Sequence, residues 1–198
     1  MAASSNQYTP PRNVPHPDDG RTAFFYGTLM APEVLHRVCH GSSLPDNPIF
    51  ATHNLKTYPA ILPNHQRHRV KGADYPAILP HPTSTVRGTY VTGLTDSDIW
   101  RLDIFEGSEY ERVKVTCELL ENQPPKTYSN IRVTGTDRVQ FGATFGANGR
   151  EEVEAETYMW IGGEERLEER EWDFAEFQRE KMRFWIGEEG KEEYAGEL

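Results

Sequence analysis

Glu106 is the residue of this sequence best placed for acid–base chemistry, because a predicted helix ends there. The negative end of the helix dipole and the carboxylate of Asp103, one turn earlier, both disfavour the ionised form of Glu106. Burial would raise the pKa of this carboxyl further. A carboxyl that exchanges its proton near neutral pH can serve as general acid and base. On the residues alone, the alternative is a solvated glutamate before a helix-ending glycine.

A second candidate site is the turn formed by Tyr26, Gly27, Thr28 and Leu29. The aromatic stretch at 23–26 predicts a short buried strand, and Gly27 ends it with a tight turn into the next helix. The N–H groups of Gly27, Thr28 and Leu29 then face the same way and can bind an anion or a carbonyl oxygen. The alternative is an ordinary corner between a strand and a helix.

The helix that positions Glu106 carries clear terminal signals. Thr95 and Asp98 form a Thr-x-x-Asp capping box, and Gly107 is typical of the position after a helix end. The apolar patterns elsewhere predict strands at 49–58, 86–93, 110–120, 131–134 and 151–161, and helices at 32–40 and 172–186.

The composition limits the class of protein. The 198 residues predict a disordered arm at 1–20, one domain at 21–187 and an acidic tail at 188–198. The net charge of −10 argues against nucleic acid or an anionic membrane as partner. Two cysteines provide neither a disulfide framework nor a cysteine-rich zinc site. With no apolar signal or membrane-spanning run, the expected location is cytoplasmic.

Histidines in a basic stretch raise the question of a metal site. His65 and His68 lie close together in the sequence, with His81 nearby, but no further ligand follows at a recognisable spacing. The interpretation is a solvated loop, and no metal is expected.

Several short motifs occur in an order typical of one superfamily. They are Phe-Phe-Tyr-Gly-Thr-Leu at 24–29, Asp-Tyr-Pro-Ala-Ile at 74–78, Val-Arg-Gly-Thr-Tyr at 86–90 and Leu-Asp-Ile-Phe-Glu-Gly-x-x-Tyr-x-Arg at 102–112. The chain thereby resembles the γ-glutamylcyclotransferase-like superfamily over residues 22–186, apart from the irregular stretch at 122–150. Two later motifs, at 157–160 and 172–177, resemble its AIG2-like branch.

The resemblance implies an α+β fold, a small mixed β-barrel with flanking helices and one cavity. In characterised members, the Tyr-Gly-Thr-Leu loop binds the γ-glutamyl group through backbone N–H groups, and a glutamate that matches Glu106 is the acid–base residue. The implied activity is γ-glutamyl cyclotransfer, which releases 5-oxoproline from a γ-glutamyl amine or amide without metal or organic cofactor. The expected partner is therefore a small-molecule substrate, with the oligomeric state left open.

Further residues are assigned by the same resemblance. Tyr26 either lines the cavity or anchors its strand in the core, and Tyr110 either borders the site or packs across the strands. Tyr75 belongs to the Tyr-Pro-Ala motif and is expected to shape a cavity wall. Arg112 pairs either with a substrate carboxylate or with a nearby acidic residue such as Asp103.

Fold and activity are separate claims, so other functions stay open. The same glutamate could serve a lyase, an isomerase or another cyclase acting on a small metabolite. The aromatic content and the stretch at 122–150 keep that alternative open. A non-catalytic ligand-binding module is the third hypothesis, and the joint presence of Glu106 and the loop at 26–29 argues against it.

Overall fold

The computed structural model describes residues 20–43, 48–49, 53, 55–120, 126–127, 144–145 and 149–187. The predicted arm and acidic tail, and the strand predicted at 131–134, lie outside the described residues. The strands are β1 (Arg21–Phe25), β2 (Lys56–Arg69), β3 (Pro76–Leu94), β4 (Tyr110–Leu119), β5 (Lys126–Thr127), β6 (Thr144–Phe145) and β7 (Glu151–Trp160). The α-helices are α1 (Pro32–His40), α3 (Asp96–Glu106), α4 (Phe174–Glu180) and α5 (Met182–Ile186), with short 3-10 turns η2 (Thr28–Met30), η3 (Gly107–Glu109) and η4 (Glu164–Arg166).

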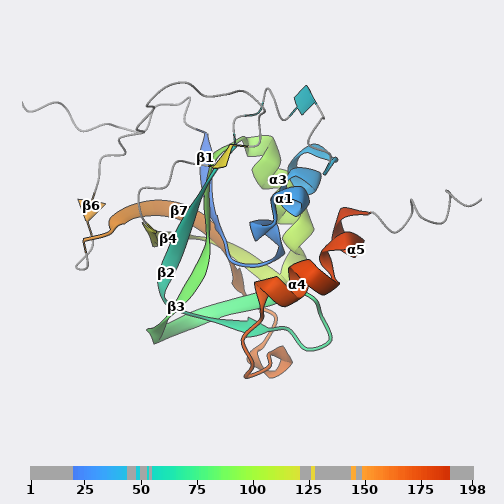
Figure 1. Ribbon diagram of the computed structural model, residues 1–198. Coiled ribbons are helices and arrows are strands. Elements are labelled where there is room, and N and C mark those ends of the chain that lie inside the picture. The colour runs from blue at the N-terminus through green and yellow to red at the C-terminus, as the bar shows by residue number, and fades with distance from the viewer. Residues whose placement is uncertain are drawn as a thin grey trace, which may run out of the picture.

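All of these strands belong to a single mixed sheet. Its order is β1-β3-β2-β4-β7-β6, with β5 on β2, and neighbours along this path are antiparallel. A parallel pairing of Ala23 in β1 with Glu156 in β7 connects the first strand to the far side of the sheet. The helices gather on one side of these strands (Figure 1). The expected α+β class with flanking helices is therefore confirmed.

The apolar residues form separate clusters on the two sides of the sheet strands. One cluster lies among β1, β2, β3, β4 and β7 and includes Phe24, Leu62 and Ile78. The other packs the helices onto the strands and includes Leu102 and Phe177. Because alternate residues of a strand face opposite sides, Phe24 joins the first cluster and Phe25 the second. Strand β1 therefore holds the two halves of the domain together.

The hairpin of β2 and β3 corrects two predictions. Strand β2 begins at Lys56 rather than at residue 49, and it includes the basic stretch at 65–69 that was predicted to be a loop. In that stretch, Arg69 pairs with Pro76 and His65 with Pro80. The local sequence does not predict this pairing, because residues 65–69 form a strand only through their partners in β3.

Helix α3 has the ends that its sequence predicts. The Thr95 hydroxyl accepts the N–H of Asp98, and the Asp98 carboxylate accepts the N–H of Thr95, so both halves of the capping box are present. At the other end, Gly107 has a φ of 71°, which favours glycine. The C-terminal helix, in contrast, is not continuous over 172–186, because Lys181 interrupts it between α4 and α5. No helix in the described parts of the chain is long and apolar enough to cross a bilayer.

Candidate active site

A cavity of about 190 Å³ opens between the end of β1, the end of α3 and the start of β3 and β4. It brings together every site residue that the sequence analysis predicted. Its lining residues are Phe24, Phe25, Tyr26, Gly27, Thr28, Leu29, Tyr75, Pro76, Phe105, Glu106, Glu109, Tyr110, Tyr158 and Trp185. The walls are mainly aromatic, and none of the described lysines, arginines or histidines lines the cavity.

Glu106 supplies the cavity with a carboxyl whose proton affinity is unusual. Burial raises its pKa from the usual 4.5 to about 8. The sequence analysis attributed part of this effect to Asp103 and the helix dipole, whereas the structure gives burial as its cause. The Asp103 carboxylate pairs with Arg112 and accepts the hydroxyl of Tyr158. Within the described residues, Glu106 itself forms neither a hydrogen bond nor an ion pair, so its carboxyl is available to a ligand.

The loop after β1 forms the wall next to this carboxyl. Gly27 has a negative φ of −124°, so the turn does not require glycine for a left-handed conformation. Glycine is required instead by a close approach, because a Cβ at this position would lie 2.8 Å from Cγ of Pro76. The first N–H groups of the following 3-10 turn have no acceptor inside it. The loop at the cavity wall thus has backbone N–H groups that the turn does not use, and at Gly27 the wall is thin because it packs against the Pro76 ring.

Replacing Gly27 with alanine should reduce activity without unfolding the protein. The added methyl group must displace the Pro76 ring, which lines the same cavity. Since a displacement of about 1 Å in a site can cost about 100-fold in rate, we expect kcat/KM to fall by about 10- to 100-fold. Steady-state kinetics and thermal unfolding of G27A would test this. A variant with unchanged kcat/KM would contradict the close-packing argument.

The tyrosines of the cavity all donate their hydroxyl protons to the protein. Tyr26 donates to the carbonyl of Tyr158 over 2.6 Å, and Tyr110 donates to the carbonyl of Pro76 over 2.8 Å. Tyr75 donates to Glu109, which also pairs with Arg166. Burial raises the pKa of Tyr26, Tyr110 and Tyr158, so these hydroxyls stay protonated at neutral pH.

These hydrogen bonds limit what the site can bind. A hydroxyl that already donates its proton still accepts hydrogen bonds through its oxygen. The tyrosine oxygens can therefore accept from a ligand ammonium, whereas the donors for a ligand carboxylate or carbonyl oxygen are the protonated Glu106 carboxyl and the N–H groups of the loop at 27–29. Tyr26 and Tyr110 both line the cavity, and each also donates a hydrogen bond to a backbone carbonyl of the sheet. For each of them, therefore, both alternatives left open by the sequence apply.

Two residues that support the cavity were missed by the sequence analysis. Arg67 on β2 donates to the carbonyl of Tyr26 over 2.9 Å, pairs with Glu171 and lies over the ring of Trp172. The signal in the sequence was a basic stretch in an acidic chain. Trp185 reaches the cavity wall because the chain bends at Lys181. That bend has no strong local signal.

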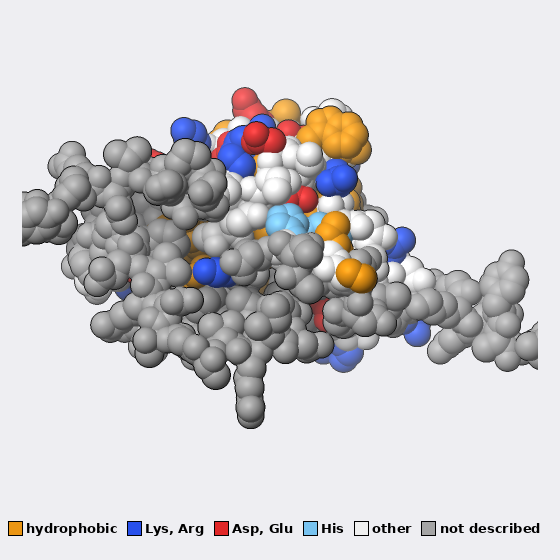
Figure 2. Space-filling model, turned by 90° about the horizontal axis from the view of Figure 1, so that it is seen from above, with side chains coloured by type: hydrophobic (Ala, Val, Ile, Leu, Met, Phe, Trp, Pro, Cys, Tyr) orange, Lys and Arg blue, Asp and Glu red, His pale blue; other side chains and the backbone are white. Residues whose placement is uncertain are grey.

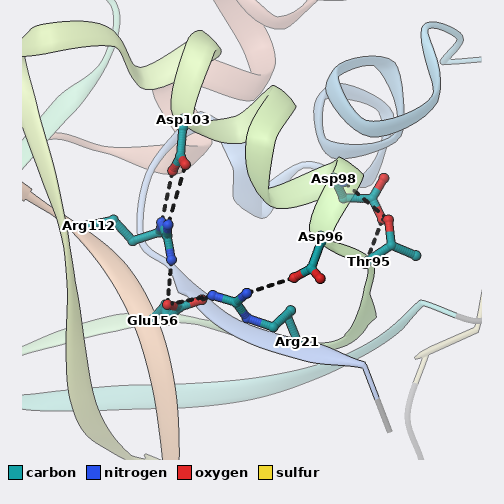
Figure 3. A network of polar contacts seen from close by, with 7 residues as sticks. All are labelled: Arg21, Thr95, Asp96, Asp98, Asp103, Arg112 and Glu156. Carbon is teal, nitrogen blue, oxygen red and sulfur yellow. Dashed lines mark hydrogen bonds and ion pairs between the residues drawn. The ribbon is translucent and has the colours of Figure 1, made fainter. Parts of the chain in front are cut away.

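Helix α3 is attached to the sheet by a network of charged residues (Figure 3). Arg112 on β4 donates to Asp103 of α3 over 2.9 Å and to Glu156 of β7 over 2.5 Å. Arg21 joins Glu156 to Asp96 at the other end of the helix. Because Arg112 is occupied in this way and does not line the cavity, its role is to position the helix that carries Glu106.

Replacing Arg112 with glutamine should therefore lower stability. The change leaves Asp103 and Glu156 without their shared cation, although Glu156 keeps Arg21. We expect a loss of about 1–2 kcal/mol in the free energy of unfolding, more than a single surface pair provides. Urea unfolding of R112Q would measure it. Arg87→Gln is the control, because it removes a positive charge from an exposed position of β3 that belongs to no part of this network. Equal losses in the two variants would contradict the network.

The histidines that the sequence analysis considered as ligands do not come together. His65 lies against the carbonyl of Pro63, and His68 against the carbonyl of Glu168. His81 lies on β3. The prediction of a loop is wrong, because His65 and His68 lie on β2 and His81 lies on β3.

Comparison with known proteins points to one family. Residues 23–174 match the family model for gamma-glutamyl cyclotransferase, AIG2-like. Protein AIG2 C of Arabidopsis thaliana is 26% identical over 154 residues, which cover 78% of this chain and 70% of that protein. AIG2-like protein D of the same plant is 28% identical over 177 residues, or 89% and 90% of the two chains. A solution structure of an Arabidopsis thaliana protein, 24% identical, has a TM-score of 0.51 over 86% of this chain and 80% of that one, and shares the fold. The chain therefore belongs to the gamma-glutamyl cyclotransferase, AIG2-like family.

Proposed function

We propose that this protein is a γ-glutamyl cyclotransferase that releases 5-oxoproline from a γ-glutamyl amine or amide, with Glu106 as its acid–base residue. One observation carries the proposal. The buried Glu106 carboxyl, with a pKa of about 8, lines the same cavity as the loop formed by Tyr26, Gly27, Thr28 and Leu29. Membership of the family supports the same activity.

The reaction requires proton transfer and positioning. Glu106 in its ionised form takes a proton from the α-ammonium of the substrate, and the freed amine attacks the γ-carbonyl carbon. The oxyanion is stabilised by N–H groups of the loop. The bond to the leaving nitrogen then breaks as Glu106 returns the proton to it, and the attacking nitrogen passes its second proton to the released amine, so that 5-oxoproline and an ammonium product form without consumption of water. Since the attack is intramolecular, no metal or organic cofactor is needed.

The surroundings of Glu106 suit both protonation states that this cycle requires. Without substrate, a pKa of about 8 keeps most of the carboxyl protonated at pH 7. A bound ammonium favours the ionised form, because an opposite charge lowers the pKa of a carboxyl. The oxygens of Tyr26 and Tyr110 are placed to accept from the same ammonium, since both hydroxyls donate elsewhere.

The test is 5-oxoproline release from a panel of γ-glutamyl amines, γ-glutamyl amino acids and glutathione, measured by chromatography. Release from at least one substrate at an enzyme-dependent rate is the expected result. Release from none of them would overturn the cyclotransferase proposal while leaving the fold intact.

A second candidate function is supported by the cavity walls. Aromatic side chains dominate them, and among the described residues no basic side chain lines the cavity to bind a substrate carboxylate. An apolar or cationic metabolite would suit such walls, with Glu106 as the base of a lyase, isomerase or cyclase. Ligand binding to the protein by an apolar amine, with no 5-oxoproline formed from any γ-glutamyl compound, would favour this alternative.

A further inference from the structure

A cluster of histidines lies at the opposite end of α3 from Glu106. His36 and His40 stand one turn apart on α1, and the ring of His53 packs against that of His40 with centroids 4.5 Å apart. The start of α3 adds the buried carboxylate of Asp98, whose side chain is 2% exposed. Figure 2 looks down on this end of the molecule and shows histidine side chains reaching its surface together.

Hydrogen bonds define the proton positions on the ring of His53. Its Nε2 lies 2.9 Å from the carbonyl of Gly93 and 3.3 Å from Oδ2 of Asp98. Both neighbours are acceptors, so Nε2 carries the proton of the neutral ring and Nδ1 carries the lone pair. That Nδ1 is in contact with Nε2 of His40. Nε2 of His40, on α1, and Nδ1 of His53, in a separate segment of the chain, therefore lie side by side.

The second nitrogen of His40 holds its ring so that Nε2 faces His53. This nitrogen, Nδ1, lies 3.2 Å from Nδ1 of His36, and in the tautomer in which His40 donates this hydrogen bond its Nε2 keeps a lone pair toward His53. Histidines that bind metals are usually held in this way, by a hydrogen bond at the nitrogen that does not bind. The carbonyl of Gly93 does this for His53, and His36 does it for His40.

We propose that His40, His53 and Asp98 bind a divalent transition-metal ion of the zinc type. Each of the three offers one ligand atom, and these atoms lie within 4.8 Å of one another. Two imidazoles and a carboxylate favour zinc over magnesium or calcium, which prefer oxygen ligands throughout. A tetrahedral ion bound by three side chains keeps one position for water.

The contacts of Asp98 define the surroundings of its carboxylate. Oδ1 has Nη1 of Arg101 at 3.7 Å, whereas Oδ2 lies 3.3 Å from Nε2 of His53 and accepts the N–H and the hydroxyl of Thr95. The ion would connect the end of α1, the segment at residue 53 and the first turn of α3. Asp98 and Glu106 are eight residues apart on that helix, which corresponds to about 12 Å along its axis. The ion would therefore stabilise the helix without contacting the cavity.

The experiment uses the full chain, treated with a chelator and then dialysed. Zinc is titrated by isothermal calorimetry, and bound metal is counted by elemental analysis. We expect one zinc ion per chain and a rise in Tm on zinc addition. Cobalt in place of zinc should give the visible absorption of a tetrahedral site.

Matched variants locate the site. His40→Gln and His53→Gln should each weaken zinc binding by more than about 100-fold, since even the orienting partners of metal ligands contribute about 10- to 100-fold. His65→Gln is the control, because that ring lies on β2 outside the cluster. Equal weakening in the control, tighter binding of magnesium than of zinc, or no zinc bound at micromolar protein would overturn the proposal.

A measurement on the unchanged protein covers the case in which a variant does not fold. The histidine ring nitrogens give separate signals in a ¹⁵N spectrum of the side chains. Zinc should shift the signals of Nε2 of His40 and Nδ1 of His53 and leave those of His65 in place. Zinc-induced shifts that spare His40 and His53 would show a hydrogen-bonded histidine chain without a metal site.

Discussion

Replacing Glu106 with glutamine is expected to lower kcat for 5-oxoproline release by about 10²–10⁴-fold. The amide has the shape of the acid and fits the same cavity, but it neither takes a proton from the substrate ammonium nor returns one to the leaving amine. KM should change little, because the loop at 27–29 and the tyrosine oxygens, which bind the substrate in the proposed reaction, remain. Single-turnover measurements of 5-oxoproline formation would separate the chemical step from product release.

Glu111→Gln is the control for this variant. Glu111 lies on β4 with an exposed side chain, so the change removes one carboxylate of the same type outside the cavity. A second check is the pH dependence of the wild type. Because the free enzyme must be ionised at Glu106 to accept the proton, kcat/KM should rise about tenfold per pH unit up to the pKa of about 8. A wild-type rate in E106Q would remove Glu106 from the mechanism.

The same variant should be more stable than the wild type at alkaline pH. The Glu106 carboxyl has a pKa of about 8 in the folded chain and 4.5 as its usual value. The folded state therefore binds the proton more tightly, and the stability that this contributes is fully present below about pH 4.5 and lost as the pH rises to about 8. Each tenfold difference in proton affinity is worth about 1.4 kcal/mol, so the loss across this window is up to about 5 kcal/mol. Glutamine does not titrate, so E106Q does not lose this stability as the pH rises.

Urea unfolding at pH 5 and pH 8.5 would measure this effect as a difference between variant and wild type. The two proteins should be closest in stability at pH 5, and E106Q should be the more stable at pH 8.5. The difference in unfolding free energy between the two proteins is compared at the two pH values. This removes the contribution of all other titrating groups and any pH-independent cost of burying an amide. Parallel pH curves for the two proteins would show that Glu106 is not buried as an acid. Glu111→Gln should follow the wild type.

Local signals in the sequence predicted the elements that carry the site. The capping box of Thr95 and Asp98, with Gly107 after the last turn, defined helix α3 at both ends. These contacts form between residues three or four apart, so the sequence itself contains both partners. The helix at 32–40 was predicted correctly for the same reason. Motif order then identified Glu106 and the loop at 26–29 as parts of one site.

Contacts between distant residues produced the errors. The basic stretch at 65–69 is a strand because it pairs with 76–80, and its charge is balanced by Glu171 and Glu176 about a hundred residues away. The helix predicted over 172–186 is divided at Lys181, and this bend places Trp185 against the cavity. No local pattern contains this information, because each partner is distant in the sequence.

The sequence by itself determined the candidate residues, since Glu106 and the Tyr-Gly-Thr-Leu loop are recognisable from residue type and order and line one cavity in the structure. The tertiary structure decided how that chemistry is tuned. Burial raises the pKa of Glu106, whereas the neighbouring Asp103 is neutralised by Arg112 from another strand. Burial depends on every helix and strand that covers a side chain, and these can be distant in the sequence. The residues around Glu106 in the sequence therefore do not predict it. The convergence of His40, His53 and Asp98 is of the same kind, because three separate segments must meet to form it.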